Sequence, residues 1–107
     1  CALPICGSFR VLDVEDASMT IKITLTPGHG MNYHSHENRD EVWTVISGTG
    51  HAILDGVRRD VKAGDILTMP AGCRHTVFAD SELKIIEVQL GPAISVEDKQ
   101  KYPLPQA

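Results

Sequence analysis

The sequence lacks three features that would each assign the protein to a broad class. No apolar run approaches the ~20 residues of a membrane-spanning helix, so we expect no membrane partner. The net charge of −4 comes without a basic stripe, which argues against a nucleic-acid-binding role. The three cysteines are an odd number at scattered positions, which favours a reducing cytoplasm over a secreted disulfide framework.

The composition that is present is that of an ordinary globular protein. Apolar residues make up 42% of the chain and charged residues 22%. A length of 107 residues is that of one domain with one modest core. We therefore expect a single domain over residues 1–107, with a core at about 9–91 and a tail over 92–107.

Short segments of strand character, separated by turn residues, recur along the chain. Met19–Thr26 alternates apolar and polar side chains, which predicts a strand with one buried face. Asp55-Gly56 predicts a hairpin, because its turn needs positive φ angles. The expected strands are Phe9–Val14, Met19–Thr26, Glu41–Ser47, His51–Leu54, Val57–Val61, Asp65–Met69, Arg74–Ala79 and Leu83–Leu90. Their regular spacing predicts an all-β fold of the barrel or jelly-roll kind.

The tail has a different character from the strands. Ser95 is followed three positions later by Asp98, which resembles the start of a helix. We expect one short helical turn near Val96–Lys101, ended by Pro103 and Pro105.

Four side chains are candidate ligands of one divalent metal ion. His34 and His36 are two residues apart, so on a strand both would point to the same face. Glu41 opens the following strand and His75 opens a strand much later in the chain. Three imidazoles and a carboxylate suit Zn²⁺, Fe²⁺, Mn²⁺, Co²⁺ or Ni²⁺. From these residues alone, unrelated surface histidines remain an open alternative.

Two motifs resemble those of the cupin superfamily. Gly28-x5-His34-Ser-His36-x4-Glu41-x6-Gly48 resembles the first cupin motif, and Gly64-x5-Pro70-Ala-Gly72-x2-His75 resembles the second. A spacer of 15 residues separates Gly48 from Gly64. The second motif usually ends in Asn, and here that position is Ala79. The resemblance implies a single-domain cupin, a double-stranded β-helix, with His34, His36, Glu41 and His75 as the metal ligands.

The resemblance extends to a narrower group. Arg39–Thr49, Met69–Gly72 and Leu83–Gly91 are similar to the C-terminal cupin domain of type II mannose-6-phosphate isomerases. In those enzymes the domain is often fused to a mannose-1-phosphate guanylyltransferase. The family commonly has two residues between the second His and the Glu, whereas here there are four, Glu37–Asp40. This lengthens the loop at the metal site.

The resemblance implies a metal-dependent isomerase that interconverts mannose 6-phosphate and fructose 6-phosphate through a cis-enediol. Glu87 is the first candidate for the base, with Glu37 and Asp40 as further candidates. Arg39 and Arg74 are candidates for phosphate binding, because guanidinium groups present a fork of donors. Trp43 shares the strand face of Glu41, so it should lie inside the barrel, where it packs or stacks on a sugar ring.

Two other functions fit the same set of ligands. One is a non-catalytic cupin module that binds a metal or a sugar, and the other is a metal-dependent oxygenase of a small organic substrate. A fold does not fix a function, so the sequence leaves all three open and favours the isomerase. The resemblance also implies a homodimer. His29 and His51 are expected at the surface or in loops, and Cys73 as a small buried side chain.

Overall fold

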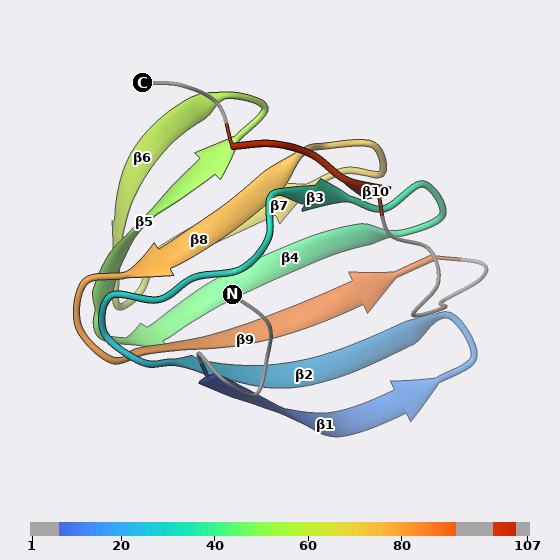
Figure 1. Ribbon diagram of the computed structural model, residues 1–107. Helices are drawn as coiled ribbons and strands as arrows, with labels where there is room; N and C mark the ends of the chain where they lie inside the picture. Colours follow the sequence, from blue (N-terminus) through green and yellow to red (C-terminus); the bar gives the residue numbers. More distant parts are fainter. Residues whose placement is uncertain (1–6, 92–99, 105–107) are drawn as a thin grey trace.

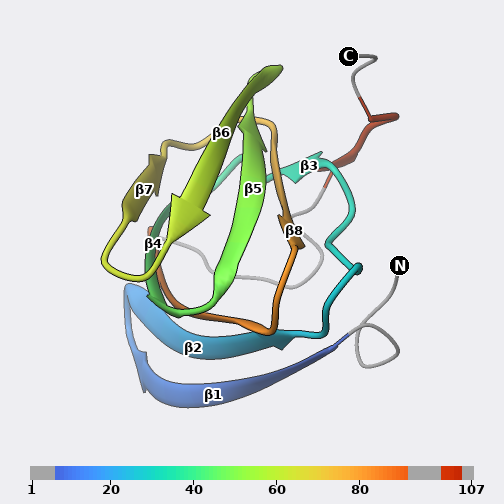
Figure 2. The ribbon, with the colours of Figure 1, turned by 90° about the vertical axis from the view of Figure 1, so that its left-hand side faces the viewer.

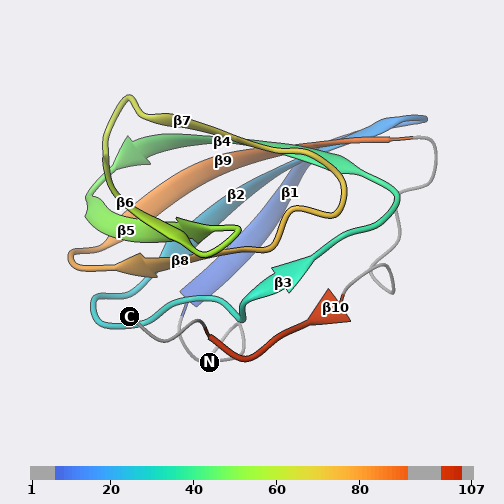
Figure 3. The same ribbon diagram turned by 90° about the horizontal axis from the view of Figure 1, so that it is seen from above.

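The computed structural model describes residues 7–91 and 100–104, which form two antiparallel β-sheets (Figures 1 and 2). The strands are β1 (Gly7–Glu15), β2 (Ser18–Leu25), β3 (His34–Ser35), β4 (Asp40–Ser47), β5 (Thr49–Leu54), β6 (Val57–Lys62), β7 (Ile66–Met69), β8 (His75–Ala79), β9 (Leu83–Leu90) and β10 (Gln100–Lys101). Figure 3 shows the sheets as two layers, with β7, β4 and β9 in one and β5, β8 and β3 in the other.

The first sheet, with strand order β1-β2-β9-β4-β7, alternates between a buried and a partly exposed face. On β2 the buried residues are Ile21, Ile23 and Leu25, as the alternation in the sequence predicts. β9 lies between β2 and β4, so each of its inward residues has a neighbour on both sides. The centre of this sheet therefore supplies most of one wall of the core.

The second sheet has the order β10-β3-β8-β5-β6. Its β5–β6 hairpin turns at Asp55 and Gly56, whose φ angles are 47° and 83°, as the Asp-Gly signal requires. Before β3, the chain runs beside β8, where the Met31 N–H donates to the Val77 carbonyl at 3.1 Å. This stretch delivers β3 to the edge of β8.

The apolar core lies between the two sheets. Trp43, Leu67 and Leu83 are among its largest fully buried side chains. Burial of such side chains contributes roughly 1.5–3 kcal/mol each, before the entropy of ordering the chain is counted. Buried polar side chains also lie in the interior of the protein, next to the apolar core, and they form the site described below.

The all-β jelly-roll prediction is confirmed, and its eight strands appear with ends shifted by at most two residues. Two short strands, β3 and β10, were not predicted. The helical turn expected near 96–101 is wrong at its described end, because Gln100 and Lys101 pair with β3 as a strand. Residues 96–99 lie outside the described part of the chain. Pairing with β3 gives the backbone N–H and C=O groups of Gln100 and Lys101 hydrogen-bond partners. The end of a short helix would leave such groups unpaired.

Within residues 7–91 and 100–104, we find no helix with the length and apolar character needed to span a membrane.

Candidate metal centre

Three histidines from different parts of the chain meet in the interior. His34 on β3 lies directly opposite His75 on β8, because these strands are neighbours in the second sheet. His36 follows His34 by two residues. All three side chains are buried, and one ring nitrogen from each lies within 4.8 Å of those of the others. The sequence prediction that these histidines converge is confirmed.

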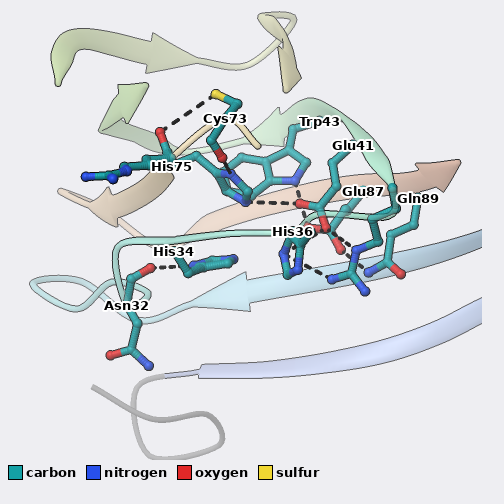
Figure 4. A network of polar contacts seen from close by, with 11 residues as sticks. Asn32, His34, His36, Glu41, Trp43, Cys73, His75, Glu87 and Gln89 are labelled. Carbon is teal, nitrogen blue, oxygen red and sulfur yellow. Dashed lines mark hydrogen bonds and ion pairs between the residues drawn. The ribbon is translucent and has the colours of Figure 1, made fainter. Parts of the chain in front are cut away.

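Backbone carbonyls orient two of the three rings. Nδ1 of His34 is 2.6 Å from the Asn32 carbonyl oxygen, and Nδ1 of His75 is 3.0 Å from the Cys73 carbonyl oxygen. A carbonyl oxygen only accepts, so each Nδ1 must carry the proton. In the neutral form of each ring, Nε2 then has a lone pair, which is the tautomer that metal-binding histidines use. Figure 4 shows both rings with these contacts.

Glu41 brings a carboxylate to the histidines from the opposite sheet. Its side chain is 2% exposed; Oε2 is 3.2 Å from Nε2 of His36, and Oε1 is 3.2 Å from Nε2 of His75. Neither Glu41 Oε1 nor His75 Nε2 makes a hydrogen bond to any part of the described chain. A buried carboxylate oxygen and a buried ring nitrogen that lack hydrogen bonds are atoms that a bound cation would coordinate.

The electrostatic surroundings keep Glu41 ionised. Burial alone would raise the pKa of its carboxyl, but contact with the His75 ring, then the charges of His36 and Arg39, lower it to about 2. Arg39 is buried and donates from Nε to Glu41 Oε2 at 2.9 Å, and its Nη2 lies 3.1 Å from Nε2 of His36. The site therefore contains an anionic oxygen among three imidazole rings.

A second buried carboxyl lies next to this cluster. Glu87 on β9 accepts from Trp43 Nε1 at 2.7 Å and from Gln89 Nε2 at 2.7 Å (Figure 4). Burial and then the neighbouring Glu41 carboxylate raise the pKa of Glu87 to about 7. The strand parity that predicted an inward Trp43 is confirmed, and the candidate base Glu87 is buried as well.

The remaining predicted site residues are spread over several environments. Arg39 lies in the site, whereas Arg74 is exposed, and its guanidinium carbon sits 3.8 Å from the centre of the Tyr102 ring. Since His75 points inward, its neighbour Arg74 points to the opposite face of the strand. Glu37 and Asp40 are exposed, and Asp40 Oδ1 accepts from the Ala71 backbone N–H at 2.7 Å.

Three side chains outside the metal-ligand set have plain structural roles. His29 is exposed and bonds Thr26 Oγ1 at 2.9 Å, while His51 is only 22% exposed and stacks on Phe78. Burial raises the pKa of the half-buried Cys73 thiol to about 11, with the nearby Asp55 as a further cause. A thiol of this pKa is a poor nucleophile at neutral pH.

Sequence reasoning missed two residues that shape the site. Gln89 donates to one oxygen of Glu87; the period-two alternation places Gln89 on the same face of β9 as Glu87 but does not indicate this hydrogen bond. The Tyr102 hydroxyl is hydrogen-bonded to Ser35 Oγ at 2.9 Å, and Ser35 lies between His34 and His36 in the chain. No local signal indicated this contact, because 67 residues separate its partners.

The donors fit a divalent transition-metal ion. Three imidazoles and one carboxylate, all buried, form a ligand set that Zn²⁺, Mn²⁺, Fe²⁺, Co²⁺ and Ni²⁺ accept. Two of the three buried side-chain atoms without hydrogen bonds in the described chain, Glu41 Oε1 and His75 Nε2, lie in this site and agree with that fit.

A family model described as the cupin domain matches residues 21–89. The chain belongs to the cupin domain family. The matched range contains all the histidines and both carboxyl groups of the cluster described above.

Curated relatives of this cupin include mannose-1-phosphate guanylyltransferases. That of Klebsiella pneumoniae is 25% identical over 79 residues, a match covering 72% of this chain and 17% of the relative. The cupin therefore spans a small part of that protein's length. An uncharacterized protein of Aquifex aeolicus is 30% identical over 71 residues, which is 66% of this chain and 59% of that protein. The resemblance to the cupin region of these mannose-phosphate enzymes is confirmed.

Solved structures share the fold. KdgF from Halomonas sp. superposes with a TM-score of 0.78 at 20% identity, covering 89% of this chain and 86% of that one. The salicylate 1,2-dioxygenase from Pseudaminobacter salicylatoxidans also gives a TM-score of 0.78, at 14% identity over 84% of this chain and 28% of its own. At these identities the likeness is one of fold.

Proposed function

We propose that this cupin is a metal-dependent sugar-phosphate isomerase that interconverts mannose 6-phosphate and fructose 6-phosphate. The observation that carries the proposal is the pair of buried carboxyl groups with different partners. Glu41 faces the histidines, while Glu87 beside it accepts hydrogen bonds from Trp43 and Gln89. An aldose–ketose isomerisation needs both a site for an ion and a base that moves a proton between neighbouring carbons.

His34, His36, Glu41 and His75 would hold the ion, which when bound polarises the oxygens of the substrate as a Lewis acid. Glu87 takes the proton from C2, next to the carbonyl of the open-chain sugar, which leaves a cis-enediolate. It returns this proton to C1 as the hydroxyl proton passes from O2 to O1, so no proton is gained or lost overall. Trp43 and Gln89 fix the orientation of Glu87 through its two oxygens. Trp43 is fully buried, so we assign it to holding Glu87 and to packing.

Arg39 is our candidate for the phosphate, because it is the sequence-predicted guanidinium that lies in the site. Arg74 points to the other face of β8 and is a weaker candidate. Glu37, on the exposed loop that precedes β4, is a second candidate for proton transfer. The names of the curated relatives, which contain mannose 1-phosphate, support a phosphorylated hexose as the substrate class.

The test uses the full chain, stripped with a chelator and reloaded separately with Zn²⁺, Mn²⁺, Fe²⁺, Co²⁺ or Ni²⁺. Each form is assayed for conversion of mannose 6-phosphate to fructose 6-phosphate and with a panel of other sugar phosphates. We expect turnover with at least one ion, its loss in His75→Ala and Glu87→Gln, and its retention in the control His29→Ala. Metal-loaded protein without turnover on any sugar phosphate would refute the isomerase.

One observation favours the second function, a non-catalytic module that binds a metal or a sugar. Arg39 is engaged with Glu41 and His36, and Arg74 faces away, which leaves few cations for a phosphate among the described residues. Calorimetric binding of an unphosphorylated sugar without turnover would support this module. Oxygen uptake by the iron-loaded protein with a small organic substrate would instead support an oxygenase.

Two further expectations stay proposals. We propose a cytoplasmic location, which the free Cys73 and the scattered cysteines support. We also propose a homodimer, which requires a self-complementary surface on each copy.

A further inference from the structure

The strand β1 is nine residues long and forms one edge of the first sheet. Among the described strands it pairs only with β2, and its residues from Ser8 to Glu15 are exposed (Figure 1). Such an edge presents a row of backbone N–H and C=O groups to any other strand. The other outer edges of the described sheets are blunted: β7 and β10 are short, and β6 carries the charged run Arg58–Asp60.

β1 also has an apolar face that none of the described residues buries. Its register places Phe9, Val11 and Val14 on the side of the sheet that β2 uses for the core. These three side chains are nevertheless 59%, 45% and 61% exposed. The strand would be expected to bury this face in an assembly, because a contiguous apolar row on an edge strand invites association.

A bulge between Val11 and Asp13 keeps the two faces of β1 distinct. Leu12 is the extra residue, so the alternation restarts after it. As a result, Arg10 and Asp13 lie on the same face although three positions separate them, and both lie opposite residues of the outer face of β2, Lys22 and Thr20. One face of β1 is apolar and the other is polar along its whole length.

This pattern is self-complementary about a two-fold axis. If β1 of a second copy runs antiparallel to β1 with the axis between Val11 and Leu12, Phe9 faces Val14 of the second copy. Arg10 then faces Asp13 of the second copy, and the symmetry makes this ion pair twice. Apolar residues meet apolar residues, and opposite charges meet on the other face.

Neighbouring registers lose this match. A shift by one residue in either direction puts Arg10 opposite an apolar side chain, Leu12 or Val14, and Phe9 opposite Asp13 or Glu15. A shift that pairs Arg10 with Glu15 leaves Leu12 opposite Asp13 and Phe9 beyond the end of the partner strand. The symmetric register about Val11 and Leu12 is the one that satisfies both faces.

We propose that two copies of this chain associate through antiparallel pairing of their β1 strands, with Arg10 of each copy opposite Asp13 of the other, so that the first sheet continues across the dimer. The charge complementarity at Arg10 and Asp13 selects a second copy as the occupant of this edge. The assignment does not depend on the reaction at the metal site, so either can fail without the other.

The test is a charge-swap series on the full chain, measured by sedimentation equilibrium over a range of concentrations. The wild-type chain sediments as a dimer. Arg10→Asp alone and Asp13→Arg alone place like charges opposite each other, and each weakens dimerisation by roughly tenfold or more. The double variant Arg10→Asp with Asp13→Arg restores the dimer, and an equimolar mixture of the two single variants forms a heterodimer.

Arg58→Asp on the edge strand β6 is the matched control, with the same change of charge and no effect on the dimer. Circular dichroism and a thermal melt establish that each variant is folded. The proposal is overturned if the wild-type chain stays monomeric, or if the single reversals leave the dimer unchanged. It is also overturned if folded single reversals are not rescued by the double swap, or if Arg58→Asp dissociates the dimer.

Discussion

Replacing Trp43 by phenylalanine separates the packing of the core from the support of Glu87. The Trp43 side chain is completely buried, and its Nε1–H donates to Glu87 Oε1 at 2.7 Å. Phenylalanine keeps a ring in the core but removes the donor and the second ring. The Gln89 bond to the other oxygen of Glu87 remains.

Two contributions set the size of the effect. Leaving a buried carboxyl oxygen without its donor costs about 1–3 kcal/mol. The atoms lost from the indole leave a small cavity, which adds about 1–2 kcal/mol. We therefore expect Trp43→Phe to lower the free energy of unfolding by about 2–5 kcal/mol. Domains of this size have only about 5–15 kcal/mol in total, so the loss is readily measured.

The assay is urea unfolding of the chelator-treated protein, followed by circular dichroism because the variant lacks its tryptophan. A double-mutant cycle with Glu87→Leu isolates the hydrogen bond, since removing both partners leaves neither of them unsatisfied. We expect the double variant to be more stable than the sum of the single losses implies. Leu25→Ala is the control, because Leu25 pairs at the Leu83 end of β9 and should combine additively with Trp43→Phe. A loss below about 1 kcal/mol, or additivity with Glu87→Leu, would refute the reasoning.

Three further predictions follow from other contacts. The ring of Trp43, the sole tryptophan, lies 5.3 Å from that of His75, so binding of Co²⁺ or Ni²⁺ should quench the tryptophan fluorescence. His75→Ala should lower the affinity for the metal by roughly 100-fold or more. The pKa of Asp65 is lowered from 3.8, chiefly because its carboxylate accepts a hydrogen bond from the Lys62 backbone N–H. The contribution of Asp65 to stability is therefore full above pH 3.8 and disappears as the pH falls through the lowered pKa. In acid unfolding, the stability advantage of the wild type over Asp65→Asn should shrink over this range. A Cβ at Gly50 would overlap the Phe78 carbonyl oxygen, so Gly50→Ala should destabilise the protein by about 1–3 kcal/mol in thermal melts.

Each of these predictions has a control and a contradicting result. His29→Ala should leave the quenching unchanged, and quenching that survives His75→Ala at the same metal concentration would place the ion elsewhere. A gap between wild type and Asp65→Asn that stays constant from neutral pH to pH well below 3.8 would contradict the role of Asp65. Gly56→Ala has open space but a φ of +83°, so only the strain of about 1 kcal/mol applies, and a larger loss there than at Gly50 would contradict the packing argument.

The strands could be predicted because their signals are local. The alternation in β2 and the Asp55-Gly56 turn each depend on a few consecutive residues, and the structure has both. β3 and β10 could not be found in this way, because each is two residues long and exists only through pairing with a distant strand. The expected helical turn was wrong at Gln100 and Lys101 for the same reason, since strand pairing outweighed a local capping pattern.

The residues of the candidate site were likewise predictable only in part. The motif resemblance named His34, His36, Glu41 and His75, and the structure brings the three histidines together beside the carboxylate. Arg39 and Arg74 were equal candidates in the sequence. The structure separates them, because Arg39 turns into the site and Arg74 lies over Tyr102 on the outer face.

The sequence by itself determined the all-β architecture and the identity of the clustered histidines, because side-chain periodicity, turn chemistry and motif spacing are written in neighbouring residues. Only the tertiary structure decided which carboxyl group is ionised beside the histidines and which is held by Trp43 and Gln89. Glu41 and Glu87 are chemically alike in the sequence. Their difference arises from burial and from partners on neighbouring strands, which only the assembled sheets bring within hydrogen-bonding distance.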